Sequence, residues 1–387
     1  MNWIIPLALL LAAFWTAVIV SWMVTVVLLP VAIWAVARFY LRGDDLSRYD
    51  GERPGGEPPP PSDAHFETVE LLQRMGENAP KGPRRQRLKR LREAMDQMGE
   101  GRAGDAEIRA VDVAGVPGEW VLAPGADPSR RLLYLHGGAF VMGSPMSHRP
   151  ITARLSEIAG ASVLAVDYRL MPEHKRLDCL ADCQTAYRWI IDHGPAGAAP
   201  VATLFVAGDS AGGNLTLALI AWARDVGLRR ADAAVALSPA TDATLSSPSI
   251  LENLDSDHML GPMFRPFAKL PKTLALWFGW LTTGVRPCDP RVSPAHGNLD
   301  NLPPTLVHAS EAELLIDDAR RYVNKARAAG SPAELETWHH VLHVWHIFED
   351  RLPEAQAAFE RIGVFLESVA PRRSSGESST PQSLDAG

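Results

Sequence analysis

The first forty residues stand apart from the rest of the chain because they form one apolar run. From Trp3 to Tyr40 no charged side chain occurs before Arg38. This run of roughly 35 residues is longer than the ~20 that a helix needs to cross hydrocarbon. We predict a transmembrane segment over residues 1–42, either one helix that is tilted or kinked at Pro30, or a tight hairpin.

The flanks of the apolar run indicate its orientation. A cleaved signal peptide fits poorly, because no basic residue precedes the run, the run is too long, and no small-residue cleavage site ends it. Arg38 and Arg42 follow the run, whereas no Lys or Arg precedes it. The positive-inside rule then predicts a single-pass membrane protein with its large C-terminal domain in the cytoplasm.

Composition changes sharply after the apolar run and again near the C-terminus. Residues 43–64 are rich in Gly, Pro and acidic residues, which predicts a semi-extended tether that holds the next domain off the bilayer. Residues 371–387 are rich in Ser, Pro and Gly, so we predict a disordered tail.

A basic helical pattern follows the tether, within residues 65–104. The run Arg84–Arg92 is strongly basic, so one interpretation places it on anionic headgroups. However, Leu88, Leu91 and Met95 recur at helical spacing, which favours a cap helix with one packed face and one solvated face.

Over residues 65–370, apolar runs of strand length alternate with longer helical patterns. This alternation predicts an α/β fold, with a mostly parallel eight-stranded sheet covered on both faces and ligands at the carboxyl ends of its strands. The predicted strands are Ile108–Val113, Trp120–Ala123, Leu132–Leu135, Val163–Asp167, Leu204–Gly208, Ala233–Leu237, Thr305–Ala309 and Leu335–Trp338, and the clearest helices are Leu180–Ile191, Leu215–Ala223 and Asp317–Ala329.

Composition narrows the classes of function. A chain of 387 residues with 47% hydrophobic residues can bury one large core. Its net charge of −7 argues against a nucleic-acid binder. The three cysteines include no Cys-x-x-Cys, and Cys179 and Cys183 fall on one helix face, so we predict neither a disulfide framework nor a zinc site.

A Gly-x-Ser-x-Gly turn joins an apolar strand to an apolar helical pattern. Gly208 and Gly212 flank Ser210, and because glycine has no Cβ the turn can be sharp enough to hold the hydroxyl above the sheet. The pattern alone is common, but its position after a strand predicts a nucleophilic serine at Ser210.

Consecutive glycines follow the strand Leu132–Leu135 and can supply backbone donors. In acyl transfer, negative charge develops on the carbonyl oxygen, and amides aimed at that oxygen stabilise it. We predict that the amides of Gly137, Gly138 and Ala211 form this oxyanion hole. The neighbouring His136 invites a general-base interpretation, but beside a Gly-Gly turn it is expected to order the loop.

Two later segments can supply a base and an acid for Ser210. The base is expected at His343, which lies among four histidines after the last strand; a metal is disfavoured there because no carboxylate or cysteine accompanies them at ligand spacing. The acid is expected in the loop after Thr305–Ala309, where Glu313, Glu311 and Asp317 are all candidates. The order nucleophile, acid, base is the one α/β-hydrolases use.

Together these motifs resemble the hormone-sensitive-lipase-like family of serine esterases, a branch of the α/β-hydrolases. The resemblance implies that Ser210 is the nucleophile and His343 the base, and that an acyl-enzyme forms and is hydrolysed. Aligning Asp317-Asp318 with the family's acidic pair puts Glu313 in the acid position. Besides the motifs at His136 and Ser210, the resemblance to this family rests on three further segments: Val166–His174, Ser238-Pro239 with Thr241-Asp242, and Asp289–Pro294.

The chain departs from the family at two places, and several nearby residues are expected to be structural. Ala139 replaces a third glycine but keeps the backbone donor, and Lys175–Asp178 replaces an apolar stretch. Asp209 neighbours Ser210, yet adjacent residues on such a turn point apart, so we expect it to hold the turn and the His136 loop. Asp167 and Tyr168 are interpreted as scaffold too.

The predicted activity is hydrolysis of a small, hydrophobic carboxylic acyl ester. We predict that the reaction needs no metal or organic cofactor, and that nucleic acid is not a partner. The aromatic insertion 253–285 is expected to form a lid with residues 65–104. Alternatives are a ligand-binding module that has lost turnover, or an amidase or lactonase. The sequence leaves the acyl chain, the alcohol and the oligomeric state open.

Overall fold

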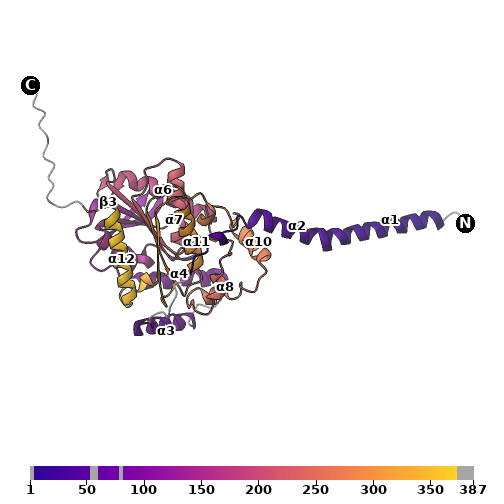
Figure 1. Ribbon diagram of the computed structural model, residues 1–387, viewed down its shortest axis with the longest axis horizontal. Helices are drawn as coiled ribbons and strands as arrows, with labels where there is room; N and C mark the ends of the chain where they lie inside the picture. Colours follow the sequence, from indigo (N-terminus) through magenta and orange to yellow (C-terminus); the bar gives the residue numbers. More distant parts are fainter. Residues whose placement is uncertain (1–3, 53–59, 78–81, 373–387) are drawn as a thin grey trace, which may run out of the picture.

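The computed structural model describes residues 4–52, 60–77 and 82–372. It consists of an α/β domain from which one long helix projects (Figure 1). Most of the predicted disordered tail, 371–387, lies outside the described residues, as do residues 53–59 of the predicted tether.

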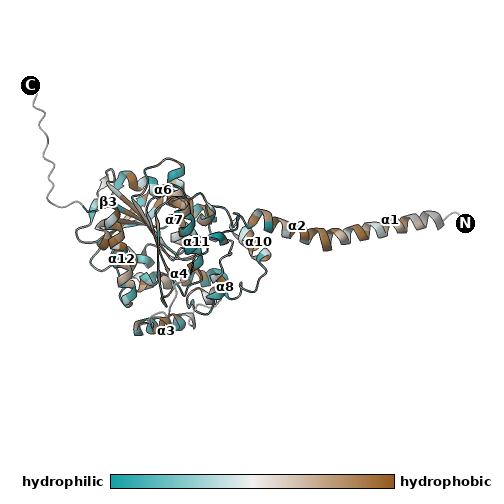
Figure 2. Cartoon of the chain, in the orientation of Figure 1, coloured by the Kyte–Doolittle hydropathy of each residue, from teal (hydrophilic) through white to brown (hydrophobic). Residues whose placement is uncertain are grey.

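The N-terminal apolar run is helical throughout its described length, and its colour in Figure 2 is mostly that of hydrophobic residues. Leu10–Leu41 has a mean hydropathy of 2.4 and is, by length and composition, the one described helix that qualifies to cross a membrane; a signal sequence meets the same criterion. The helix continues through Pro30, so the predicted hairpin is wrong. Its parts are α1 (Ile4–Met23), the π-helical turn η1 (Val24–Leu28), α2 (Leu29–Val36) and the π-helical turn η2 (Ala37–Leu41).

The residues that follow this helix pack onto the α/β domain. Leu41 and Leu46 are buried, and Asp50 forms an ion pair with Arg321 at 2.5 Å. Asn324 Nδ2 donates to the carbonyl of Tyr49, 2.9 Å away, at the end of the short 3₁₀ turn η3 (Ser47–Tyr49). The predicted tether is therefore wrong for residues 43–51, because ion pairing and burial hold this segment against the domain.

The sheet has eight strands in the order β1-β2-β4-β3-β7-β8-β9-β10. Within this sheet the pairs β4-β3, β3-β7, β7-β8, β8-β9 and β9-β10 are parallel, and the pairs β1-β2 and β2-β4 are antiparallel. The predicted eight-stranded, mostly parallel sheet is confirmed. The strands are β1 (Glu107–Val113), β2 (Val116–Leu122), β3 (Asp127–Leu135), β4 (Ala161–Val166), β7 (Thr203–Asp209), β8 (Ala233–Leu237), β9 (Thr305–Ser310) and β10 (Ala333–Trp338).

Helices cover both faces of this sheet, as Figure 1 shows. The central strand β8 is buried along its whole length, and its sequence Ala-Ala-Val-Ala-Leu is a continuous apolar run, as expected for a parallel strand covered on both faces. One face carries α5 (Arg149–Ala159) and α12 (Pro353–Val369), and the other carries α6 (Arg176–Asp192), α7 (Ala211–Asp225) and α11 (Ile316–Ala328).

The remaining elements are short or lie at the margins of the sheet. A two-stranded ribbon that the sequence pattern did not predict joins β5 to β6. These elements are α3 (Asp63–Glu77), α4 (Arg84–Gly99), η4 (Met146–His148), β5 (His193–Gly194), β6 (Gly197–Ala198), α8 (Ser249–Glu252), α9 (Gly261–Phe264), α10 (Lys272–Thr283), η5 (Pro294–His296) and η6 (Trp345–Phe348).

The two predicted lid segments contact different parts of the molecule. α4 turns Leu91 and Met95 toward a cavity above Ser210, and Arg92 ties this helix to the domain through Glu173 at 2.8 Å. In contrast, α10 packs against the N-terminal helix, where Trp277 Nε1 donates to the carbonyl of Ile33 at 3.0 Å. The prediction that all of 253–285 covers the site is therefore wrong for α10.

Candidate active site

Ser210 lies at the turn between β7 and α7 in a conformation that L-residues rarely adopt. Its φ is 51° and its ψ is −113°. The turn is tight enough that a Cβ on Gly208 or Gly212 would overlap backbone carbonyl groups. The two glycines therefore permit the close passage that presents the Ser210 hydroxyl at the carboxyl edge of the sheet.

Three side chains from different loops form a hydrogen-bonded chain. The Oγ of Ser210 lies 2.9 Å from Nε2 of His343, in the loop after β10. The other ring nitrogen of His343, Nδ1, lies 2.6 Å from Oε2 of Glu313, in the loop after β9. The Ser310 amide donates to the second oxygen of Glu313 at 3.0 Å, so the carboxylate is fixed at both oxygens.

Glu313 shifts the pKa of His343 and orients its ring. Burial alone would lower the pKa of His343, but the hydrogen bond and charge of Glu313 outweigh burial and raise it. Burial raises the pKa of Glu313, which the hydrogen bond from His343 opposes. With Nδ1–H directed at Glu313, the lone pair on Nε2 is left to accept the proton of the Ser210 hydroxyl.

The other two acids that the sequence offered have different partners. Glu311 and Asp317 both form ion pairs with Arg320, and Asp317 also accepts a hydrogen bond from the Ser249 amide at 2.9 Å. Among the three predicted acids, Glu313 is therefore the one in contact with His343.

The predicted oxyanion donors are placed unequally. The amide of Gly137 donates to Oδ1 of Asp209 at 2.9 Å, so its assignment as an oxyanion donor is wrong. Gly138 and Ala139 line the cavity with Ser210, and their amides donate to no other group among the described residues. Ala211 is the first residue of α7, where helix amides lack intrahelical acceptors.

Ala139 carries a further available backbone amide, which the predicted oxyanion hole of Gly137, Gly138 and Ala211 did not include. Its φ is 55°, and that of Gly138 is 110°, so two successive left-handed residues turn this loop toward Ser210. The signal was present, because Ala139 occupies a position where the resembling family has glycine. What sequence alone did not show is which of three successive amides another group already uses.

Asp209 organises the floor of the site. Its carboxylate accepts hydrogen bonds from the Tyr134 hydroxyl at 2.6 Å and the Gly137 amide, and its second oxygen lies 3.3 Å from Nε2 of His148. Burial would raise the pKa of Asp209, but His148 and Tyr134 outweigh burial and lower it. Asp209 thus joins the Ser210 turn to the loop that carries the available amides.

His136 belongs to this floor and does not contact Ser210. Its ring stacks on Tyr168 with centroids 4.2 Å apart, and the Tyr168 hydroxyl donates to the carbonyl of His136 at 2.6 Å. Burial lowers the pKa of His136 to about 3. A neutral, stacked imidazole fits the expected role in ordering the loop.

We predict that Asp209→Asn destabilises the fold and lowers activity through the position of the loop. Tyr134 and Gly137 both donate to Oδ1, so the asparagine oxygen can still accept from them, but the substitution removes the buried negative charge beside Nε2 of His148, at a cost of about 3 kcal/mol. Tyr134→Phe removes only one donor and should cost about 1 kcal/mol. Urea unfolding of both variants measures the difference; equal stability of Asp209→Asn and the parent would contradict the role.

An apolar cavity of about 320 Å³ lies directly above Ser210. Its walls come from α3, α4, the loop after β3, the segment Met259–Met263 and the segment around η6. Methionine is flexible and polarisable, so a wall rich in methionine adapts to varied apolar ligands. The cavity is lined by Met95, Met98, Met142, Met259 and Met263, with Leu72, Leu91, Ile347 and Phe348.

The other histidines near His343 point to different surroundings. His346 is buried and lies 3.2 Å from His308 between their ring nitrogens, and burial lowers its pKa. Over the described ranges, the structure contains no group of three or more His, Cys, Asp or Glu side chains arranged to hold a metal ion.

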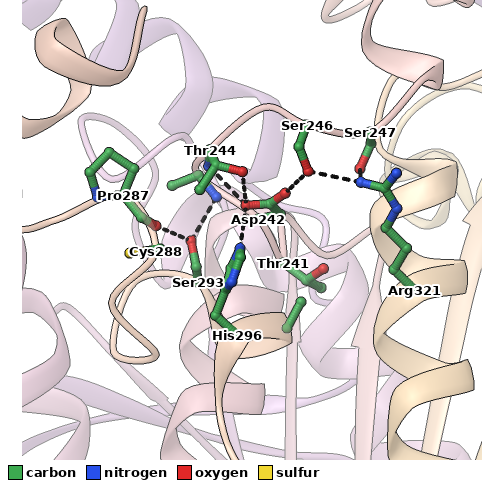
Figure 3. Close-up of polar contacts among 12 residues, drawn as sticks. Thr241, Asp242, Thr244, Ser246, Ser247, Pro287, Cys288, Ser293, His296 and Arg321 are labelled. Carbon is green, nitrogen blue, oxygen red and sulfur yellow. Dashed lines mark hydrogen bonds and ion pairs between the residues drawn. The ribbon is translucent and has the colours of Figure 1, made fainter. Parts of the chain in front are cut away.

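The remaining motifs build the support for this site. Asp242 accepts hydrogen bonds from the Thr244 and Ser246 hydroxyls, both at 2.6 Å, and lies 3.2 Å from Nε2 of His296 (Figure 3). Asp318 accepts from the amides of Thr241 and Asp242, each at 2.9 Å. These contacts fix the loop after β8, so the motifs around Asp242 are structural.

Comparison with known proteins agrees with this geometry. The sequence profile of an α/β-hydrolase fold family matches residues 132–347, which is more than half of the chain. An acetyl-hydrolase of Streptomyces hygroscopicus is 36% identical over 74% of this chain and 90% of its own length. The chain belongs to the α/β-hydrolase family.

Further relatives place it within a branch of that family. The carboxylesterase/phospholipase LipF of Mycobacterium tuberculosis is 35% identical over 69% of this chain and 71% of its own. An esterase from the bacterial hormone-sensitive lipase family, of known crystal structure, has 32% sequence identity to this chain. The two structures align with a TM-score of 0.69 over 80% of this chain and 99% of that one. The resemblance to the hormone-sensitive-lipase-like α/β-hydrolases is thus confirmed.

Proposed function

We propose that this α/β-hydrolase cleaves carboxylic acyl esters, with Ser210 as nucleophile, His343 as general base and Glu313 as the acid that orients it. The observation that carries the proposal is the hydrogen-bonded chain from Ser210 Oγ through His343 to Glu313, beneath an apolar cavity. Relatives that are named esterases and acetyl-hydrolases support the same reaction class.

The chemistry follows from the order of these contacts. Nε2 of His343 takes the hydroxyl proton as Ser210 Oγ attacks the ester carbonyl carbon, and the carbonyl electron pair moves onto oxygen. His343 then returns that proton to the departing alcohol, and the carbonyl re-forms as an acyl-enzyme. Water repeats the sequence, with His343 again as base, and releases the acid. Neither half needs a metal or organic cofactor.

The amides of Gly138, Ala139 and Ala211 are proposed to stabilise the oxyanion. The first two lie in the wall beside Ser210, and Ala211 begins α7, whose N-terminal dipole favours negative charge. Removing one such donor typically costs about 10²–10³ in rate. The amide of Gly137 is not part of this proposed set, because it donates to Asp209.

The cavity supports a hydrophobic acyl ester as substrate. Its lining has few polar groups apart from the reacting ones, so it offers hydrophobic transfer energy and little charge recognition. We propose that residues 65–104, together with the Met259–Met263 segment, form the cap that encloses the acyl chain.

Hydrolysis of p-nitrophenyl acyl esters of graded chain length tests the proposal. The parent protein should release p-nitrophenol, and a fluorophosphonate should add its phosphonyl group to the tryptic peptide that contains Ser210. Binding of the esters without release would indicate a ligand-binding module that has lost turnover. Faster cleavage of matched anilides or lactones would assign an amidase or lactonase.

We predict an acid limb of kcat/KM above pH 6.5, the ordinary pKa of a histidine. His343 acts as a base only when neutral, and Glu313 raises the pKa of His343, so activity falls as pH decreases through that raised value. Glu313→Asp, which keeps the charge, should retain the limb near its position. Residual activity of Glu313→Gln should follow a limb at lower pH, and an unchanged limb would contradict the assignment.

We also propose that the N-terminal helix anchors the protein as a single membrane span with the hydrolase domain on the cytoplasmic side. The length and hydropathy of Leu10–Leu41 support a span, and Arg38 and Arg42 at its end support the orientation. Protease added to intact cells should leave the domain uncut, whereas permeabilised cells should lose it. Cleavage of the domain in intact cells would indicate the opposite orientation. A mature protein lacking residues 1–42 would indicate a signal sequence.

A further inference from the structure

An exposed apolar surface lies beside the end of the N-terminal helix. On α10, Leu274, Phe278 and Leu281 are 50%, 52% and 74% exposed, and their spacing places them on one face of the helix. The preceding segment adds Phe267, whose ring lies 5.8 Å from that of Phe278. We call this the α10 face; its members are Met263, Phe267, Leu270, Leu274, Phe278 and Leu281.

The opposite side of α10 fixes this face to the proposed membrane span. Leu276 packs with Ala37 and Leu41 in a small buried cluster. Trp277 donates to the carbonyl of Ile33, and the ring of Trp280 lies 5.9 Å from that of Tyr40. Figure 1 shows α10 beside the end of α2, at the edge of the domain that faces the N-terminal helix.

Aromatic and basic residues at this level match the boundary of a bilayer. Trp and Tyr are enriched where hydrocarbon meets headgroups, and here Tyr40, Trp277 and Trp280 cluster. Arg38, Arg42 and Lys272 line a pocket of about 270 Å³ between the helix end and the domain. Long basic side chains at such a boundary reach headgroup phosphates while their stems stay in apolar surroundings.

We propose that the α10 face inserts into the same phospholipid leaflet in which the N-terminal helix ends, so that the hydrolase domain rests on the membrane. The packing of α10 on residues 33–41 sets its depth, because that is where the span reaches its first arginines. The proposal rests on the proposed membrane anchor and ester hydrolysis, and it extends them to the source of the substrate.

One residue, Met263, belongs both to the α10 face and to the lining of the cavity above Ser210. Met263 is 45% exposed as a member of the face, and it also lines the cavity with Met259 and Leu260. An acyl ester dissolved in the leaflet therefore has an apolar path to Ser210 without crossing water. The substrate class this favours is a membrane-dissolved ester with a long acyl chain.

Photo-crosslinking of the full chain in phosphatidylcholine nanodiscs tests this contact independently of activity. Separate variants carry p-benzoylphenylalanine in place of Ile19 in the span, Phe278 in the α10 face, or Val364 on α12, which is 62% exposed and on the domain. Position 278 should label radioactive phosphatidylcholine at least about tenfold more than position 364, and position 19 should label it strongly.

Each outcome decides the proposal. Lipid adducts at 19 and 278 but not at 364 support it. Adducts at 19 alone overturn it while leaving the anchor intact, and absence of adducts at 19 overturns the anchor and the proposal together. A crosslinked protein dimer at 278 would assign the α10 face to a second copy of the chain.

Kinetics of matched variants test the supply of substrate. The triple variant Leu274→Ser, Phe278→Ser, Leu281→Ser should hydrolyse a long-chain ester in phosphatidylcholine vesicles about tenfold more slowly than the parent, since less apolar area enters the leaflet. Its activity on soluble p-nitrophenyl acetate should stay within about twofold, as should both activities of Val364→Ser. Equal vesicle activity of parent and triple variant would overturn the route, whereas a parent inactive on the soluble ester would instead contradict the proposed hydrolase.

Discussion

Replacing Ser210 by alanine should lower kcat/KM for p-nitrophenyl esters by about 10⁴–10⁶. The variant lacks the oxygen that attacks the carbonyl, so catalysis falls to what the remaining amides and bound geometry supply. A φ of 51° is strained for alanine, but Ser210 already bears the same strain. The free energy of unfolding should therefore change little. Initial rates and fluorophosphonate labelling measure the effect, and labelling should be absent.

Ser129→Ala is the matched control for that experiment. Ser129 donates to Asp127 at the beginning of β3, and it is not among the cavity residues. The control should keep parent rates and labelling. If Ser210→Ala hydrolysed the esters at the parent rate, or if the phosphonyl group appeared on another serine, the assigned nucleophile would be wrong.

Replacing Glu313 by glutamine should lower kcat by about 10³–10⁴, the second largest effect that we expect. The change keeps the shape but removes the charge that stabilises the imidazolium, and it lets Nδ1 of His343 accept a hydrogen bond in place of donating one. Glu313 contacts His343 at 2.6 Å, so a neutral amide there favours the tautomer whose Nε2 carries a proton and cannot accept one from Ser210.

Two variants separate catalysis from structural support in this acidic loop. Glu311→Gln and Asp317→Asn weaken ion pairs to Arg320, which should lower the unfolding free energy while kcat stays within about tenfold of the parent. A loss in Glu311→Gln as large as in Glu313→Gln, with stability unchanged, would move the acid to Glu311.

Several features followed from local sequence because their causes are local. Central parallel strands were recognisable because strands buried on both faces carry apolar side chains along their length, as in β8. The position of Ser210 followed from its flanking glycines, since only residues without a Cβ permit so close a passage of backbone. The long N-terminal helix followed from an apolar run without charge.

Other predictions were wrong where a residue far away in the sequence forms a hydrogen bond or an ion pair with the segment. The amide of Gly137 resembled an oxyanion donor, but Asp209, 72 positions away, accepts its hydrogen bond. Residues 43–51 had the composition of a free tether, yet Asp50 pairs with Arg321, 271 positions away. Composition does not record which long-range partner a segment meets.

The sequence by itself determined the fold class, the apolar helix and the position of Ser210. The tertiary structure decided which acid contacts His343, which amides remain available beside Ser210, and where α10 lies. The physical reason is that propensity and turn geometry act within a few residues, whereas each of these choices is a competition for hydrogen bonds or apolar contacts. Arg320 holds Glu311 and the N-terminal helix holds α10, and such partners meet only when the chain has folded.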